Sequence, residues 1–102
     1  MKYELYLKSR NGMYDAIGIF DGENFVVKKN SKIKVLSNSK YEKNKTAEIY
    51  RNDDKYVKNG ILIKDVEFKS PSTAAQFVVN QSINGYKAWK NKEGICLKEI
   101  IK

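Results

Sequence analysis

Histidine is absent from this sequence of 102 residues, and cysteine occurs once. With no imidazole and a single thiol, Cys96, the sequence has no ligand cluster for zinc and no second cysteine for an internal disulfide. Cys96 stands between Ile95 and Leu97, which is typical of a small buried apolar residue. We therefore expect no metal site and no other cofactor.

Arginine is scarce, with only Arg10 and Arg51, although Lys and Arg together number 20 against 12 Asp and Glu. The net charge of +8 favours contact with a polyanion such as nucleic acid. Because a lysine ammonium suits a phosphate better than a base edge, the composition indicates contact with the nucleic-acid backbone. A lysine excess that serves only solubility would have the same composition.

Long apolar runs are also missing, since none approaches the roughly 20 residues of a membrane span. The first residues lack the apolar core of a secretory signal. We expect a cytoplasmic protein that contacts no membrane. The length suits a single domain over residues 1–102, and a hydrophobic content of 41% is ordinary for a folded domain.

The clearest structural pattern covers Ser70 to Lys90. Serine followed by proline is a favoured helix start, and Asn84-Gly85 suits a helix end or a tight turn. Tyr86–Lys90 alternates as a short strand, with Trp89 in the core beneath the helix. The helix between them has apolar residues at helical spacing, namely Ala74, Ala75, Phe77, Val78 and Val79.

The first third of the sequence predicts an antiparallel meander. Alternating residues indicate strands over Tyr3–Lys8 and Met13–Phe20, with Gly18 as a candidate bulge. Asp21-Gly22 is a hairpin turn into a strand at Phe25–Val27. A further edge strand is expected around Ile33, Val35 and Leu36.

The remaining elements are short. A second helix is predicted over Glu48–Lys58, ending at Asn59-Gly60. Two strands, 61–63 and 66–68, then flank a turn at Lys64-Asp65, and residues 95–97 complete a C-terminal hairpin with Tyr86–Lys90. A final helical turn has Leu97, Ile100 and Ile101 facing inward. The predicted class is α+β, an antiparallel meander sheet packed against two helices.

The most basic window runs from Lys28 to Lys45, with seven lysines and one acid, Glu42. Residues 37–46 are polar and turn-rich, as in an exposed loop. As a hypothesis, these lysines contact phosphates and Tyr41 stacks on a base. The alternative is a solvated lysine-rich loop without a ligand. The candidate contacts are Lys28, Lys29, Lys32, Lys34, Lys40, Tyr41, Lys43 and Lys45.

Glu67 and Lys69 are candidates for a catalytic site, because their spacing matches the acid-x-lysine pair of Mg²⁺-dependent nucleases. Such a site needs a further acid from a neighbouring strand, whereas Asp53-Asp54 falls on the predicted helix. An acid-x-lysine pair also arises by chance in a lysine-rich chain. We therefore expect no catalytic residue.

Three runs carry a resemblance to a known family: Phe68–Ala75, with Ser-Pro-Ser-x-Ala-Ala; Ser82–Lys90, with Ser-x-Asn-Gly and Trp-Lys; and Gly94–Leu97. They resemble domain-of-unknown-function family 4357, and the likeness covers almost the whole chain. Where many members have Leu-Lys-Gly-Ser, this sequence has Lys28-Lys29-Asn30-Ser31. The resemblance implies an accessory module, often found beside GIY-YIG nuclease or restriction-modification domains.

Charge and resemblance together predict a non-catalytic accessory module that binds nucleic acid, DNA in particular, through lysine-phosphate contacts. The resemblance implies a nuclease or methyltransferase domain as a further partner. The alternative is a protein-interaction or dimerisation module that uses a tyrosine-rich surface and an open sheet edge. A Mg²⁺-dependent nuclease is the third interpretation.

Overall fold

The computed structural model describes residues 2–34 and 45–101. Its main sheet has four antiparallel strands in the order β1-β2-β3-β6. These are β1 (Tyr3–Lys8), β2 (Asp15–Phe20), β3 (Phe25–Val27) and β6 (Val66–Phe68). A second, two-stranded sheet pairs β4 (Val57–Lys58) with β5 (Ile61–Leu62).

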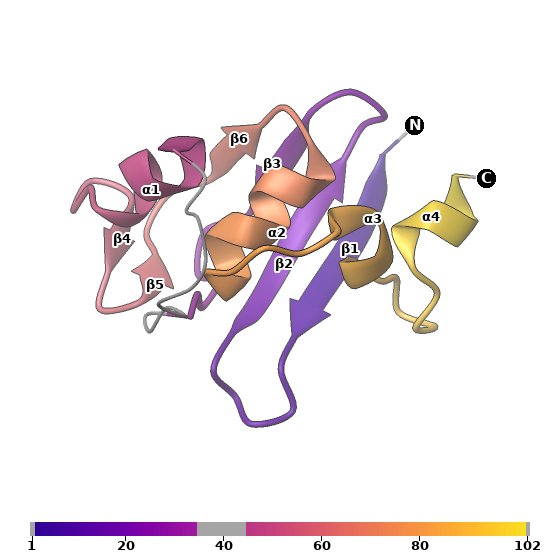
Figure 1. The fold of residues 1–102 in the computed structure, drawn as a ribbon, viewed down its shortest axis with the longest axis horizontal. Helices are drawn as coiled ribbons and strands as arrows, with labels where there is room; N and C mark the ends of the chain where they lie inside the picture. The colour runs from indigo at the N-terminus through magenta and orange to yellow at the C-terminus, as the bar shows by residue number, and fades with distance from the viewer. Residues whose placement is uncertain (1, 35–44, 102) are drawn as a thin grey trace.

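The described helices lie on one side of the main sheet (Figure 1). They are α1 (Lys45–Arg51), α2 (Pro71–Val79), α3 (Gly85–Ala88) and α4 (Leu97–Ile100). The structure therefore confirms the α+β class and the antiparallel meander of β1, β2 and β3. Within the described residues, α4 is the final helical turn that the sequence predicts, and α3 is a short helix that it does not predict.

The hydrophobic core lies between α2 and the covered face of the main sheet. Alternate residues of each strand point into it because successive side chains of a strand face opposite sides. The buried strand residues are Leu5, Leu7, Ala16, Phe20, Phe25, Val27, Val66 and Phe68, and α2 contributes Ala74, Ala75, Phe77, Val78 and Val79. The opposite face of the sheet includes Ile17, which is 41% exposed.

Helix α2 begins as predicted. The Ser70 hydroxyl accepts a hydrogen bond from the Thr73 N–H at 3.1 Å, and Pro71 occupies the first turn. The helix ends at Asn80 rather than at Asn84-Gly85, because Asn80 adopts a left-handed φ of 56° and closes the last turn. Asparagine tolerates this conformation better than most residues.

The predicted strand at Tyr86–Lys90 is wrong, because residues 85–88 form α3. The Asn84 side chain caps this helix by accepting the Tyr86 N–H at 3.0 Å. Trp89 is buried as expected, and its ring centroid lies 4.4 Å from that of Phe25. Lys90 then pairs with Tyr6, so the chain runs along the outer edge of β1.

The second predicted helix is too long. Helix α1 ends at Arg51, and Val57 and Lys58 form strand β4. Asn59 and Gly60 both have positive φ, as a two-residue type I′ hairpin turn requires, and they connect β4 to β5. Asn59-Gly60 is therefore a hairpin turn and not a helix end.

Gly18 does not form a bulge. It pairs in regular register with Leu5 and Val27. A Cβ atom at Gly18 would lie 2.2 Å from Phe25 Cε1, so glycine here makes room for the Phe25 ring.

The expected edge strand is only partly within the described residues. Lys32 forms single bridges to Asp15 and Ile61, and Val35 and Leu36 lie outside the described ranges. Most of the predicted loop 37–46 also lies outside them, although its last two residues, Lys45 and Thr46, begin α1.

The C-terminal hairpin is reduced to a single bridge between Lys90 and Cys96, followed by α4. Cys96 is half-buried rather than fully buried. Leu97 and Ile100 pack inward as expected, but Ile101 is 40% exposed. The tight turn of a four-residue helix explains this, since residues 97 and 100 share one face and residue 101 follows its end.

Candidate functional site

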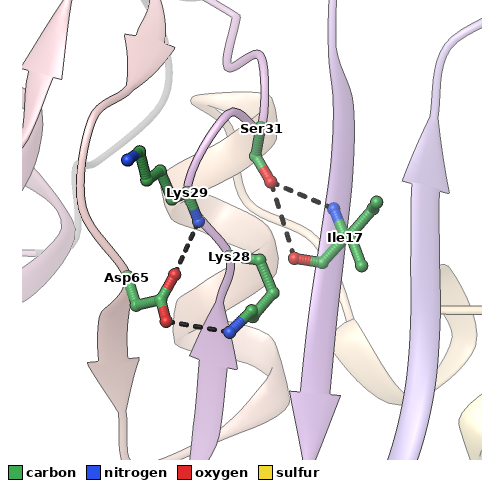
Figure 2. Close-up of polar contacts among 5 residues, drawn as sticks. All are labelled: Ile17, Lys28, Lys29, Ser31 and Asp65. Carbon is green, nitrogen blue, oxygen red and sulfur yellow. Dashed lines mark hydrogen bonds and ion pairs between the residues drawn. The ribbon is translucent and has the colours of Figure 1, made fainter.

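Two of the predicted phosphate contacts, Lys28 and Lys29, lie at a turn held by Asp65 (Figure 2). The Asp65 carboxylate accepts the Lys28 ammonium and the Lys29 backbone N–H, each at 2.8 Å. The hydrogen bond from Lys28, followed by that from Lys29, holds the pKa of Asp65 below its ordinary value of 3.8. Lys28 is therefore already paired with an acid.

The same turn explains the departure from the family pattern at Asn30. Asn30 adopts a φ of 77°, which is a conformation that glycine occupies freely and asparagine tolerates. The buried Ser31 hydroxyl accepts the Ile17 N–H at 3.1 Å and lies 3.5 Å from the Ile17 carbonyl, to which it donates (Figure 2). Asparagine can therefore occupy this turn at the position where many family members have glycine.

The other described lysines of the predicted set are separated. Lys32 Nζ donates to the Gly12 carbonyl at 2.7 Å. Lys29 and Lys32 line a smaller pocket of about 260 Å³ together with the acid Asp15. Lys34 lines a different pocket. Lys40, Tyr41 and Lys43 lie outside the described residues, and Lys45 is the first residue of α1.

A more uniformly basic pocket lies between the β1–β2 loop and the end of α2. We call it the hairpin pocket, and its volume is about 400 Å³. Lys8, Arg10 and Lys34 supply its cations, and Met13, Tyr14 and Val79 supply apolar and aromatic surface. Its other lining residues are Ser9, Asn11 and Gln81.

The backbone of Lys34 is held in place from two sides. Its N–H donates to the Val78 carbonyl of α2 at 2.8 Å. Its carbonyl accepts a hydrogen bond from the Arg51 guanidinium, which also donates to the Phe77 carbonyl. Arg51, at the end of α1, therefore connects this helix to α2 and to Lys34, which lines the hairpin pocket.

A second basic pocket, the edge pocket, lies along the outer edge of β1 and has a volume of about 420 Å³. Its cations are Lys8, Lys87, Lys90 and Lys92, and its apolar and aromatic lining is Tyr6, Leu7, Tyr14, Ile83 and Ala88. Asn91 and Gly94 complete it. The Tyr6 hydroxyl donates to the Glu4 carboxylate, and this hydrogen bond raises the pKa of Tyr6.

The two pockets share Lys8 and Tyr14 and so form one basic surface. Among residues 2–34 and 45–101, no Asp or Glu lines either pocket, although Asp15 lies opposite Lys8 in the β1–β2 ladder and Glu93 follows Lys92. Within the described ranges, none of its cationic side chains forms an ion pair. The basic surface consists of Lys8, Arg10, Lys34, Lys87, Lys90 and Lys92.

Of this basic surface, only Lys34 is among the contacts that the sequence predicts. A signal for part of the rest was present, since Lys87, Lys90 and Lys92 fall within a six-residue run that contains no acid. For Lys8 and Arg10 there was no such signal. Their neighbours on the surface come from the other end of the chain, through the pairing of Tyr6 with Lys90.

The candidate pair for metal-dependent catalysis, Glu67 and Lys69, is exposed. Glu67 and Lys69 both face solvent at β6 and its end, and Asp53-Asp54 follows α1 rather than lying on a helix. Residues 2–34 and 45–101 contain no group of three or more His, Cys, Asp or Glu side chains arranged to hold a metal ion. None of the helices in these ranges combines the length and apolar character needed to cross a bilayer.

Fold and surface together define a small α+β domain with two adjoining basic pockets at one edge of its sheet. The model of the family described as a domain of unknown function (DUF4357) matches residues 5–101, and the chain belongs to this family. The resemblance found in the sequence is thereby confirmed. Neither the curated proteins nor the solved structures include a match.

Proposed function

We propose that this domain is a non-catalytic accessory module that binds nucleic acid in the cytoplasm through lysine-phosphate contacts. The observation that carries the proposal is that the described residues lining the two adjoining pockets include several cations and no acid. A concave surface with one sign of charge raises the local concentration of the opposite charge, and a phosphate backbone is the commonest extended polyanion. Five of the six cations are lysines, which act as point charges for phosphate.

The family resemblance supports DNA as the nucleic acid. Its members often stand beside GIY-YIG nuclease or restriction-modification domains, so a nuclease or methyltransferase domain is the partner that we propose. In such an arrangement, this domain supplies affinity for the backbone and the partner supplies the chemistry. A linked binding module raises the effective concentration of the partner's substrate without new contacts at the catalytic site.

The test is fluorescence anisotropy with labelled single-stranded and duplex oligonucleotides at about 50 and 200 mM salt. We expect affinity to fall steeply with salt, because each phosphate contact releases counterions. The variant Lys8→Gln/Lys87→Gln/Lys90→Gln should lower the slope of log K against log salt by about 2 to 3. The matched variant Lys55→Gln/Lys58→Gln/Lys69→Gln removes three exposed lysines that line neither pocket and should leave the slope nearly unchanged.

A second candidate function is protein interaction, and the uncovered face of the main sheet favours it. This face includes Ile17, which is 41% exposed, with the half-buried Tyr6, Ile19 and Val26 beside it in register. Adjacent apolar residues on a solvent-facing sheet are typical of contact surfaces. A mass by light scattering that stays monomeric at every concentration would count against self-association through this face.

A further inference from the structure

Building on the proposed function, we propose that the basic surface binds single-stranded nucleic acid, with one unstacked base in each pocket on either side of Tyr14. The first reason is shape. At about 400 and 420 Å³, both hollows fall within the range of ligand pockets in proteins. Contacts to duplex phosphates need no such hollow, because the bases of a duplex stay stacked inside it.

The second reason is the chemistry of the pocket walls. Between the cations, the hairpin pocket has Met13, Tyr14 and Val79, and the edge pocket has Tyr6, Ile83 and Ala88. A surface built only for phosphates would gain nothing from these groups. An unstacked base gains by placing its apolar face on an aromatic or aliphatic side chain, and single-strand binding proteins combine such contacts with a basic groove.

The third reason is the relation between the pockets. Tyr14 and Lys8 line both of them, so neighbouring nucleotides of one strand reach the two hollows together. Lys34 and Arg10 stand on one side of this shared pair, and Lys87, Lys90 and Lys92 stand on the other. The phosphates that flank each base therefore meet a cation on both sides of Tyr14.

The experiment compares labelled DNA probes of equal length, about 12 nucleotides. They are a single strand, the matching duplex, and a strand whose central nucleotides are abasic. The abasic strand keeps every phosphate and loses only bases. We expect the full chain to bind the normal strand at least about tenfold more tightly than the abasic strand and the duplex, because stacking of one base contributes about that factor or more.

Substitutions at the pocket walls show which side chains the bases contact. Tyr14→Leu should reduce the preference for the normal strand over the abasic one, whereas Tyr14→Phe, which keeps the ring, should preserve it. Because Tyr14 packs against the core, Tyr6→Leu at the edge pocket is the second variant with the same expected direction. Lys55→Gln, which lies away from both pockets, is the control.

The outcomes separate the two proposals. Equal, salt-sensitive binding of all three probes would leave phosphate binding standing and would overturn the insertion of bases. If Tyr14→Leu and Tyr6→Leu both kept the full preference for the normal strand over the abasic strand, the insertion of bases would be overturned as well. No binding of any probe at low salt would remove the proposed function itself.

Discussion

Gly85 contacts the first turn of α2 so closely that a Cβ atom at this position would lie 2.2 Å from the Pro71 carbonyl oxygen. The same oxygen accepts a hydrogen bond from Trp89 Nε1 at 3.0 Å. The Gly85 N–H donates to the Ser72 hydroxyl, also at 3.0 Å. These contacts fix α3 on α2, and α3 in turn places Lys87 at the edge pocket.

We expect Gly85→Ala to destabilise the domain by about 3 kcal/mol, at the upper end for overpacking, because the methyl group meets backbone atoms that belong to a helix. Urea unfolding followed by circular dichroism measures the change. The control is Gly12→Ala, where φ is 75° and a Cβ would meet nothing within 4 Å. That variant should lose only about 1 kcal/mol through backbone strain. Equal losses would contradict the close packing of α3 on α2.

Trp89 provides a second test of the same region. In Trp89→Phe the buried Pro71 carbonyl loses the indole N–H, and the smaller ring leaves a void beside Phe25. The Pro71 carbonyl keeps its backbone hydrogen bond within α2, so the lost indole hydrogen bond should cost about 0.5 to 1.5 kcal/mol in the free energy of unfolding, and the void adds to this. Tyr86→Phe, which removes a hydroxyl from a half-buried neighbour, should stay within about 0.5 kcal/mol of the wild type. A loss in Trp89→Phe no larger than in Tyr86→Phe would contradict this role.

The sequence predicts this part of the fold unevenly, and the two Asn-Gly pairs show why. Ser70-Pro71 starts a helix correctly because capping is a local interaction between adjacent residues. Asn-Gly permits a hairpin turn, a helix end or a helix cap, and the choice depends on distant partners. Asn59-Gly60 is a turn because β4 pairs with β5. Asn84-Gly85 begins a helix because glycine alone fits against Pro71.

The candidate site was harder to predict than the fold, because its cations come from separate parts of the chain. A sliding window finds charge that is close in sequence, and Lys28 to Lys45 is the most basic window. In the structure, Lys28 of that window forms an ion pair with Asp65, and the Lys32 ammonium donates a hydrogen bond to the Gly12 carbonyl. The basic surface arises when Lys90 pairs with Tyr6 beside Lys8, which is a contact between strand edges that composition does not reveal.

Asp65 should make stability depend on pH in the acid range. Its pKa is lowered in the folded state, so its contribution is fully present above the ordinary value of 3.8 and is lost as pH falls through the lower folded pKa. The side chains of Asp65 and its partner Lys28 are both more than 40% exposed. Asp65→Asn should therefore lower the free energy of unfolding by no more than about 1 kcal/mol at pH 7. Urea unfolding of both proteins between pH 7 and pH 3 measures the difference.

The difference between the wild type and Asp65→Asn should shrink as the pH approaches 3, since protonation removes the same charge that the substitution removes. Asp54→Asn is the matched control, because Asp54 is exposed and outside this cluster. It should show no such pH-dependent difference. A gap between the wild type and Asp65→Asn that stays constant over this range would mean that the carboxylate charge contributes nothing to the turn.

Two pairs of lysines with equal charge distinguish the predicted patch from the basic surface. Lys29→Gln/Lys32→Gln and Lys87→Gln/Lys90→Gln each remove two positive charges, so their effect on the net charge of the domain is identical. Lys29 and Lys32 share their pocket with Asp15, whereas none of the described residues that line the edge pocket is an acid. We therefore expect the second pair to weaken binding of a single-stranded probe at least about tenfold at low salt, and the first pair to weaken it by about threefold or less. Circular dichroism establishes that both variants fold, and a larger loss from Lys29→Gln/Lys32→Gln would place the nucleic acid at the turn after β3 instead of at the edge of β1.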